Sequence, residues 1–148
     1  MKISKVSSNF FASLTSSIPY NFKIYCASNN LERNQGEYCI RDNSKYYFCD
    51  FVIPELKICV EFYGDYWHCN PAKYTEDYYH PQKQKFARQI WEEDKERLDA
   101  IKRLRNFNTY IVWESEKDIK LDFIIKEIQN AVANQNKIKE ECGSSASI

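Results

Sequence analysis

Two apolar runs constrain the fold of this chain more than any other feature. They are Lys45–Ile53 and Ile58–Tyr63, and only the segment Pro54–Lys57 separates them. Both runs are rich in aromatic and β-branched residues, which favour strands, and a proline at the start of a short connection favours a tight turn. We therefore predict a β-hairpin. If its turn closes symmetrically, Asp50 lies directly opposite Glu61.

Two carboxylates that face each other across a hairpin indicate a metal site. Like charges directly opposite in a sheet are destabilising, and a divalent cation is the usual reason for keeping them there. The following segment Gly64–His68 adds an imidazole close to the strand end. Asp50, Glu61 and His68 therefore predict a metal-dependent hydrolytic site. The alternatives are solvated carboxylates on an exposed sheet face and a loop histidine without a chemical role.

The composition is that of one packed domain. The chain has 148 residues, 16% of them aromatic, and only three glycines, which argues against disorder. We expect one domain over residues 1–140 and a flexible polar tail over residues 141–148. The 21 acidic and 21 basic residues cancel, which disfavours a protein that coats nucleic acid without regard to sequence but is compatible with a local basic face.

The six cysteines are expected to be reduced thiols. The N-terminus lacks the apolar stretch and cleavage site of an export signal, and no run reaches the roughly 18 apolar residues of a membrane span. A soluble cytoplasmic protein is therefore expected. Structural zinc is not expected, because no C-x-x-C or H-x-x-x-H spacing occurs. Cys49 and Cys59 are expected to behave as small buried hydrophobes.

Apolar periodicity and the positions of proline and glycine predict the remaining elements of an α/β (α+β) domain. The predicted helices are Ser4–Ser17, Lys85–Arg105 and Leu121–Val132. The predicted further strands are Phe22–Ala27, Tyr38–Arg41 and Thr109–Trp113. Asn29–Gly36 and the tyrosine-rich segment Cys69–Gln84 are predicted loops, and a loop of the latter length is usually functional.

An acidic residue interrupts the apolar stripe of the long predicted helix. Asp94 falls at a stripe position when residues are spaced about 100° apart. A buried unpaired charge costs on the order of several kcal/mol, so Asp94 needs a cation, a histidine or a hydrogen-bond donor. If the helix packs on the hairpin, His68 or a bound metal satisfies it; the alternative is an ion pair with a neighbouring lysine or arginine. The other stripe residues are Phe86, Ile90, Leu98, Ile101 and Leu104.

Four short motifs, Cys49–Val52, Gly64–His68, Trp91–Asp94 and Tyr110–Glu114, follow one another along the chain. Together they resemble the very-short-patch-repair (Vsr) endonucleases and the related phage-borne homing endonucleases with an EDxHD site, both branches of the PD-(D/E)XK nuclease superfamily. The resemblance spans residues 46–116, about half of the chain. It implies a restriction-endonuclease-like fold, with a central mixed sheet flanked by helices.

The resemblance also implies roles for single residues. Asp50 resembles the metal-binding aspartate of the family, and Glu61 stands where a PD-(D/E)XK enzyme places its second acid. His68 resembles the histidine of the Trp-His element, which assists with water or phosphate. Asp94 resembles the helix aspartate that holds and polarises this histidine. In the implied phosphodiester hydrolysis, Asp50 and Glu61 hold Mg²⁺, or Mn²⁺, and His68 takes a proton or stabilises developing charge.

The sequence departs from the family at several positions. Cys49 replaces the proline before the aspartate, and Tyr63 stands at the lysine position, a lysine that the Vsr-like branch also lacks. Repair members carry a histidine before the glycine, where this chain has Tyr63, and they carry a zinc site. The positions where zinc ligands would be expected are Asp65, Asn70, Ala72 and Ser115. These departures favour a homing endonuclease over a mismatch-repair enzyme.

A tyrosine-rich loop and a basic rim are the predicted DNA contacts. Tyr66 and Trp67 would wedge between base pairs or stack on bases, and the rim would contact phosphates. The alternatives are packing of the rings and an ordinary solvated face. The rim residues are Lys73, Lys83, Lys85 and Arg88. A solvated face, with Glu93 paired to Arg97, is expected for Lys95, Arg97, Lys102, Arg103 and Arg105.

The first functional prediction is a Mg²⁺-dependent homing-type DNA endonuclease of a phage or mobile element, acting on double-stranded DNA in the host cytoplasm. Each chain has one site, so a double-strand cut requires a homodimer on DNA or two successive nicks. No acidic residue precedes Glu32, so either Glu32 or Glu37 replaces the family's early-helix glutamate, or the activity is altered. The alternatives are a weak or inactive DNA-binding module, a mismatch-repair nicking endonuclease, and a Holliday-junction or RNA-processing nuclease.

Overall fold

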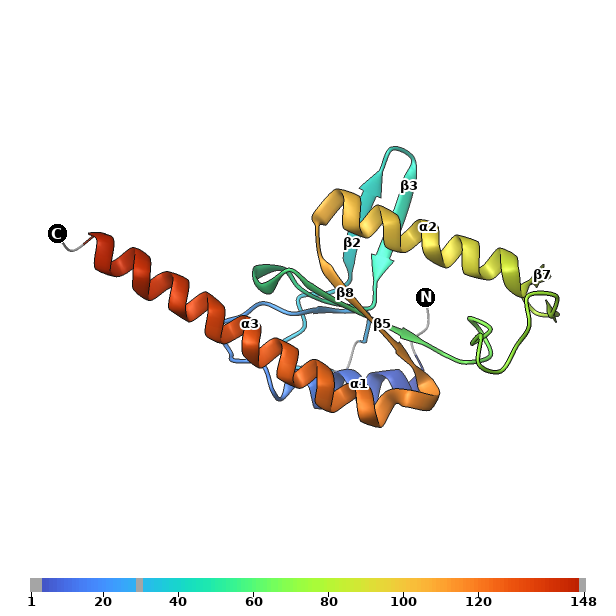
Figure 1. Cartoon of the computed structure of the whole chain (residues 1–148), viewed down its shortest axis with the longest axis horizontal. Helices are drawn as coiled ribbons and strands as arrows, with labels where there is room; N and C mark the ends of the chain where they lie inside the picture. The colour runs from blue at the N-terminus through green and yellow to red at the C-terminus, as the bar shows by residue number, and fades with distance from the viewer. Residues whose placement is uncertain (1–3, 29–30, 147–148) are drawn as a thin grey trace.

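A four-stranded mixed sheet lies at the centre of the protein, with helices on both of its faces (Figure 1). The computed structural model describes residues 4–28 and 31–146. The helices are α1 (Lys5–Thr15), α2 (Ala87–Arg105) and α3 (Lys117–Ala146). The strands of the sheet, in their spatial order, are β1 (Tyr25–Cys26), β4 (Phe51–Ile53), β5 (Ile58–Tyr63) and β8 (Asn108–Trp113). The predicted α/β (α+β) class with a central mixed sheet flanked by helices is confirmed.

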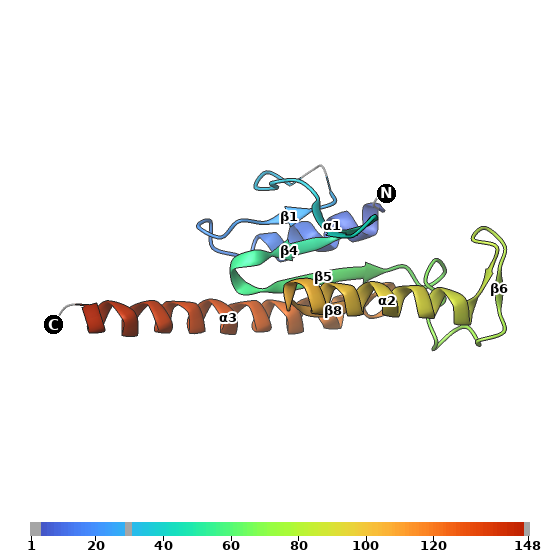
Figure 2. The same ribbon diagram turned by 90° about the horizontal axis from the view of Figure 1, so that it is seen from above.

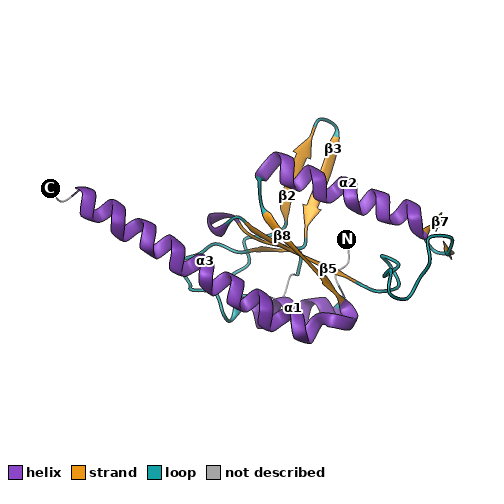
Figure 3. Cartoon of the chain, viewed as in Figure 1, coloured by secondary structure: helices purple, strands orange, loops and turns teal. Residues whose placement is uncertain are grey.

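Shorter elements lie outside the central sheet (Figure 3). Two antiparallel pairs of strands are β2 (Tyr38–Asp42) with β3 (Lys45–Cys49), and β6 (Tyr79–His80) with β7 (Lys85–Phe86). The 3-10 turns are η1 (Pro54–Leu56) and η2 (Glu114–Glu116). The predicted loop Cys69–Gln84 thus contains β6, and α2 starts two residues later than predicted because Lys85 and Phe86 belong to β7.

The predicted hairpin between β4 and β5 is confirmed. The two strands are antiparallel, with Phe51 paired to Val60. The turn η1 connects them, and Lys57 closes it in the left-handed conformation, at a φ of 53°. Extending the same register by one residue places Asp50 beside Glu61.

The run Lys45–Ile53, which the sequence predicted as one strand, is two strands. The chain bends at Asp50, so that β3 pairs with β2 in a separate ribbon while β4 continues in the central sheet. Burial explains the division, because β4 is buried at all three positions whereas β3 is largely exposed until Cys49. A two-stranded ribbon can keep one face in solvent, but a strand covered by helices on both faces cannot. The predicted strand Phe22–Ala27 is likewise reduced to Tyr25–Cys26.

Strand β5 separates two hydrophobic cores, because its side chains alternate between the faces of the sheet. Phe62 points toward α1 and α3, where the Phe11 ring stacks on Phe51 with 5.2 Å between ring centroids. Cys59 points to the opposite side and packs against α2. All six residues of β5 are buried. Glu61, two residues after Cys59, therefore lies on the α2 side in a covered position.

Helix α3 is much longer than the predicted helix Leu121–Val132. It has 30 residues, and its C-terminal part extends past the sheet (Figure 2). Residues 141–146, expected in a flexible tail, continue this helix, and residues 147–148 lie outside the described part of the chain. The prediction followed only the apolar side, but residues 133–142 contain no proline and many good helix formers. No helix in the described ranges is both long and apolar enough to cross a bilayer.

We predict that Phe11→Ala lowers the free energy of unfolding by about 3–5 kcal/mol, because it removes a fully buried ring from the core. Urea denaturation followed by circular dichroism measures this loss. Tyr20→Ala is the control, since Tyr20 is 86% exposed, and its effect should stay below about 1 kcal/mol. Equal losses for the two variants would contradict the packing of α1 on the sheet.

Candidate active site

Arg97 of α2 lies over the middle of β5 and pairs with Glu61. Its guanidinium donates to Oε1 of Glu61 at 2.8 Å, and it also donates to the backbone carbonyl of Phe48 in β3. Glu61 is only 1% exposed. The prediction that Arg97 lies on a solvated face with Glu93 is wrong. Glu93 instead accepts from Lys85 at 2.6 Å.

Asp50 lies at the bend between β3 and β4, beside Glu61. The backbone N–H of Phe62 donates to Oδ2 of Asp50 at 2.9 Å, which fixes this carboxylate against β5. Burial and the neighbouring Asp50 charge raise the pKa of Glu61 well above its usual range, although Arg97 opposes the shift. Glu61 therefore gives up its proton less readily beside Asp50, and a cation close to the two acids would favour its charged form.

His68 and Asp94 form the second part of the site. Nδ1 of His68 lies 2.9 Å from Oδ2 of Asp94, so the partner predicted for the carboxylate in the helix stripe is present. The imidazole stacks on the Tyr63 ring, with 4.0 Å between ring centroids and 6° between the planes. With Nδ1 donating to Asp94, Nε2 is the nitrogen left to accept a proton. The pair therefore orients a proton-accepting nitrogen against Tyr63, the last residue of β5.

Tyr63 is a buried phenol beneath this histidine. Its hydroxyl has no hydrogen-bond partner among the described residues. Burial first, and then the charges of Asp94 and Glu61, raise the pKa of Tyr63 above its usual value, so the phenol stays neutral. The Tyr63 ring thus serves as a flat support for the imidazole.

Five side chains converge on the α2 side of β5, and four of them were predicted from the sequence. Asp50, Glu61, His68 and Asp94 were predicted, whereas Arg97 was missed. The available signal for Arg97 was its position three residues after Asp94, which puts both side chains on one side of the helix.

No protein-family model, curated protein or solved structure matches the chain.

Two thiols also border the carboxylates. Cys49 and Cys59 are buried, as predicted, but they lie together with Glu61, and the three ligand atoms are within 4.8 Å of one another. The Cys59 thiol donates to Oε1 of Glu61 at 3.7 Å. The spacing of these cysteines in the sequence does not predict a metal site. The bend at Asp50, which the sequence did not predict either, brings them together.

The loop after β5 is held by a polar cluster at three of the positions where the resemblance places zinc ligands. The Asp65 carboxylate accepts from Asn70 at 2.9 Å, from Lys73 at 2.8 Å and from Ser115 at 3.3 Å. Burial raises the pKa of Asp65, but Lys73 and Asn70 outweigh it and hold the pKa below its usual value. Lys73 supplies the positive charge of this cluster, and Ala72 adds no side-chain ligand.

The predicted DNA contacts divide into exposed rings and paired cations. Trp67 is 51% exposed and lies with Tyr66 against the buried His80. Lys85 pairs with Glu93, Arg88 with Asp77 at 3.2 Å, and Lys73 with Asp65, while Lys83 is half-buried. The rim is therefore less electropositive than its composition predicted, because acidic neighbours neutralise most of it.

The early helix contributes no acid to the site. α1 contains no aspartate or glutamate. Glu32 and Glu37 are exposed in the segment between β1 and β2. Within the described residues neither forms a hydrogen bond or ion pair with Asp50, Glu61 or Arg97.

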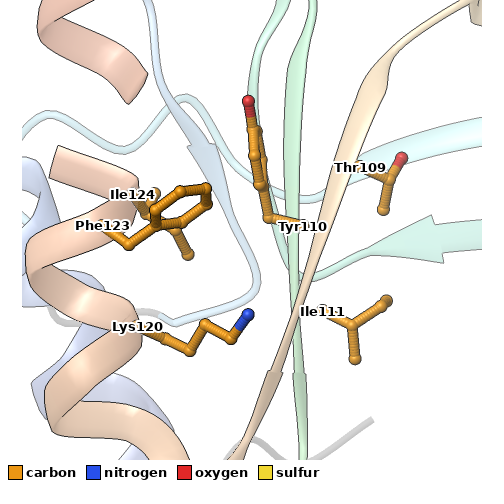
Figure 4. Close-up of a pocket in the computed structure, with 6 residues that line it drawn as sticks. All are labelled: Thr109, Tyr110, Ile111, Lys120, Phe123 and Ile124. Atoms are coloured by element: carbon orange, nitrogen blue, oxygen red, sulfur yellow. The ribbon is translucent and has the colours of Figure 1, made fainter. Parts of the chain in front are cut away.

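A separate cavity of about 300 Å³ lies between β8 and α3 (Figure 4). Its one charged residue, Lys120, has its ammonium 5.6 Å from the centroid of the Phe123 ring. The remaining lining residues are Thr109, Tyr110, Ile111 and Ile124. None of the predicted site residues lines this cavity, so it does not belong to the carboxylate site.

We predict that Arg97→Met lowers the free energy of unfolding by about 3 kcal/mol, because it leaves the buried Glu61 carboxylate without its cation. The double variant Arg97→Met with Glu61→Leu should lose less than the single variant, since the unpaired charge is also removed. Urea denaturation of both proteins at pH 7 measures the difference. A single variant as stable as the wild type would contradict the pairing.

We predict that Asp65→Asn reduces the acid sensitivity of the protein. The folded-state pKa of Asp65 lies below its unfolded value, so its stabilisation is present above about pH 4 and is lost as the pH falls through the folded pKa. Urea denaturation between about pH 5 and pH 2 should show a smaller loss for Asp65→Asn than for the wild type. Asp99→Asn, at an exposed helix position, should keep the wild-type profile, and a wild-type profile for Asp65→Asn would refute the cluster.

Proposed function

We propose that this protein is a divalent-metal-dependent DNA endonuclease of the PD-(D/E)XK type, related in mechanism to the Vsr-like and EDxHD homing endonucleases. One observation carries the proposal: Asp50 lies beside Glu61 when the register of β4 and β5 is extended by one residue, and an Asp94-held His68 follows β5 in the next loop. The mixed sheet with helices on both faces is compatible with that fold.

The two carboxylates fit a Mg²⁺ or Mn²⁺ ion. Mg²⁺ is usually held by one or two carboxylates together with water, and Asp50, which is only half-buried, keeps the pair within reach of solvent. Asp50 and Glu61 would hold the ion, and Arg97 would remain on Oε1 of Glu61. When bound, Mg²⁺ supplies polarisation of a phosphate oxygen and a lowered pKa of an attacking water.

The remaining residues position and move protons. Asp94 holds Nδ1 of His68, so that Nε2 takes the proton of the attacking water or stabilises developing charge. The Tyr63 ring covers one face of this imidazole and keeps water from it. Arg97 limits the repulsion between the two acids in the absence of substrate.

Double-stranded DNA is the proposed substrate, with exposed rings as its contacts. Trp67 stands at the loop beside His68, and Tyr46 and Phe48, 57% and 44% exposed, lie on the strand that leads to Asp50. Rings of this kind stack on bases or wedge into a base step. Arg41 lies over the Tyr46 ring at 5.8 Å and adds a cation for phosphate.

A DNA-binding module without cleavage is the second candidate function. Two observations favour it, since α1 lacks an acidic residue and Arg97 already occupies one oxygen of Glu61. Such a protein would bind DNA through the same rings and would gain nothing from Mg²⁺.

Cleavage of the DNA that flanks its own gene tests the proposal. With Mg²⁺ or Mn²⁺ the wild type should nick or cut, whereas EDTA and Asp50→Asn should abolish cleavage. His68→Ala should lower the rate at least about 100-fold, because it removes the proton acceptor. Gel electrophoresis of the products measures both effects.

Asp122→Asn is the matched control, because Asp122 is an exposed aspartate on α3, and it should cut like the wild type. Cleavage that persists in Asp50→Asn contradicts the site. A gel shift without cleavage in every protein supports the binding module.

A further inference from the structure

Two thiols lie close to Glu61, one of the two proposed Mg²⁺ ligands. Cys49 ends β3, and Cys59 and Glu61 are alternate residues on the α2 side of β5. The two Sγ atoms and a carboxylate oxygen lie within 4.8 Å of one another, and all three residues are buried. Such a set binds a metal through a different chemistry from a pair of carboxylates, because thiolates select soft or borderline ions.

The dimensions of the group are close to those of a tetrahedral zinc site. Bond lengths of about 2.3 Å to sulfur and 2.1 Å to oxygen require edges of about 3.8 Å between two sulfurs and 3.6 Å between sulfur and oxygen. The observed distance from Cys59 Sγ to Glu61 Oε1 is 3.7 Å. The group therefore needs little movement to close around an ion.

Charge and access also favour a cation there. Asp50 directly follows Cys49 and is only half-buried, so solvent reaches this edge of the group and a water can take a fourth position. Two thiolates and one carboxylate exceed the positive charge of one divalent ion by one, and Arg97 compensates this remainder. Each thiol releases its proton to solvent when the metal binds.

We propose that Cys49, Cys59 and Glu61 bind a thiophilic divalent cation such as Zn²⁺, with a water completing the tetrahedron. This site shares Glu61 with the proposed Mg²⁺ ligands. The two ions therefore exclude each other, and Zn²⁺ opposes the Mg²⁺-dependent reaction. Only this competition rests on the proposed function; the binding of the soft cation does not.

Co²⁺ is the probe, because tetrahedral thiolate ligation gives it a near-ultraviolet charge-transfer band and intense visible bands. The full chain, kept reduced with a phosphine, should bind one equivalent of Co²⁺ with both features, and Zn²⁺ should displace it. Cys49→Ser and Cys59→Ser should each weaken binding at least about tenfold and lower the charge-transfer band. Cys69→Ser is the matched control, since Cys69 is also fully buried but lies outside the group.

The absence of a charge-transfer band in the wild type overturns the proposal, as does a band that survives in both Cys49→Ser and Cys59→Ser. If the serine variants fail to fold, Cys59→Ala tests the same loss with an apolar residue. A rise in the melting temperature of the wild type with Zn²⁺ is also expected, because the ion binds the folded state.

Failure of the nuclease proposal is distinguishable from failure of this site. The Co²⁺ spectrum needs no DNA, so a protein that never cuts but shows the band supports the thiolate site alone. Asp50→Ala should abolish cleavage and keep a charge-transfer band from the two thiolates. If the protein cuts with Mg²⁺ but shows no band, the nuclease proposal is supported and the thiolate site is refuted.

Discussion

One partly buried guanidinium, that of Arg97, connects the parts of this structure on which the rest depends. Arg97 comes from α2, pairs with Glu61 in the centre of β5, and reaches the Phe48 carbonyl in β3 where the chain is about to bend. A carboxylate buried as deeply as Glu61 cannot remain charged without such a partner. The position of α2 over the sheet, the direction of the β2–β3 ribbon and the charge of the site are thus linked through one side chain.

The parts of the site that follow a local period were predictable. Asp50 opposite Glu61 follows from the period of a hairpin, and Asp94 with His68 follows from the period of a helix. Arg97 was not assigned, because a long basic side chain on a helix usually reaches solvent. The bend at Asp50 depends on which strands pair with each other. Tertiary packing determines this pairing, and the alternation of residues along one strand does not predict it.

The alternation of β5 separates apolar packing from ionic contacts within one strand. Phe62 and its neighbours on one face belong to the core beneath α1 and α3, whereas Cys59, Glu61 and Tyr63 on the other face surround the ionic site. A substitution on the first face acts on apolar packing, and one on the second acts on charge and on the stability that the Arg97–Glu61 pair supplies. The apolar core on the α1 and α3 side therefore packs without using the ionic residues on the α2 side.

The Lys73–Asp65 pair gives the loop after β5 a property that a metal-held loop lacks. A metal ion must be captured from solution, so the order of the loop that it holds changes with the supply of that ion. The ammonium of Lys73 is part of the same chain and reaches Asp65 at 2.8 Å. Lys73 lies eight positions after Asp65 in the sequence, so the presence of this charge does not depend on a dissolved ion. The contacts that hold the segment with Trp67 and His68 are therefore independent of the metal supply.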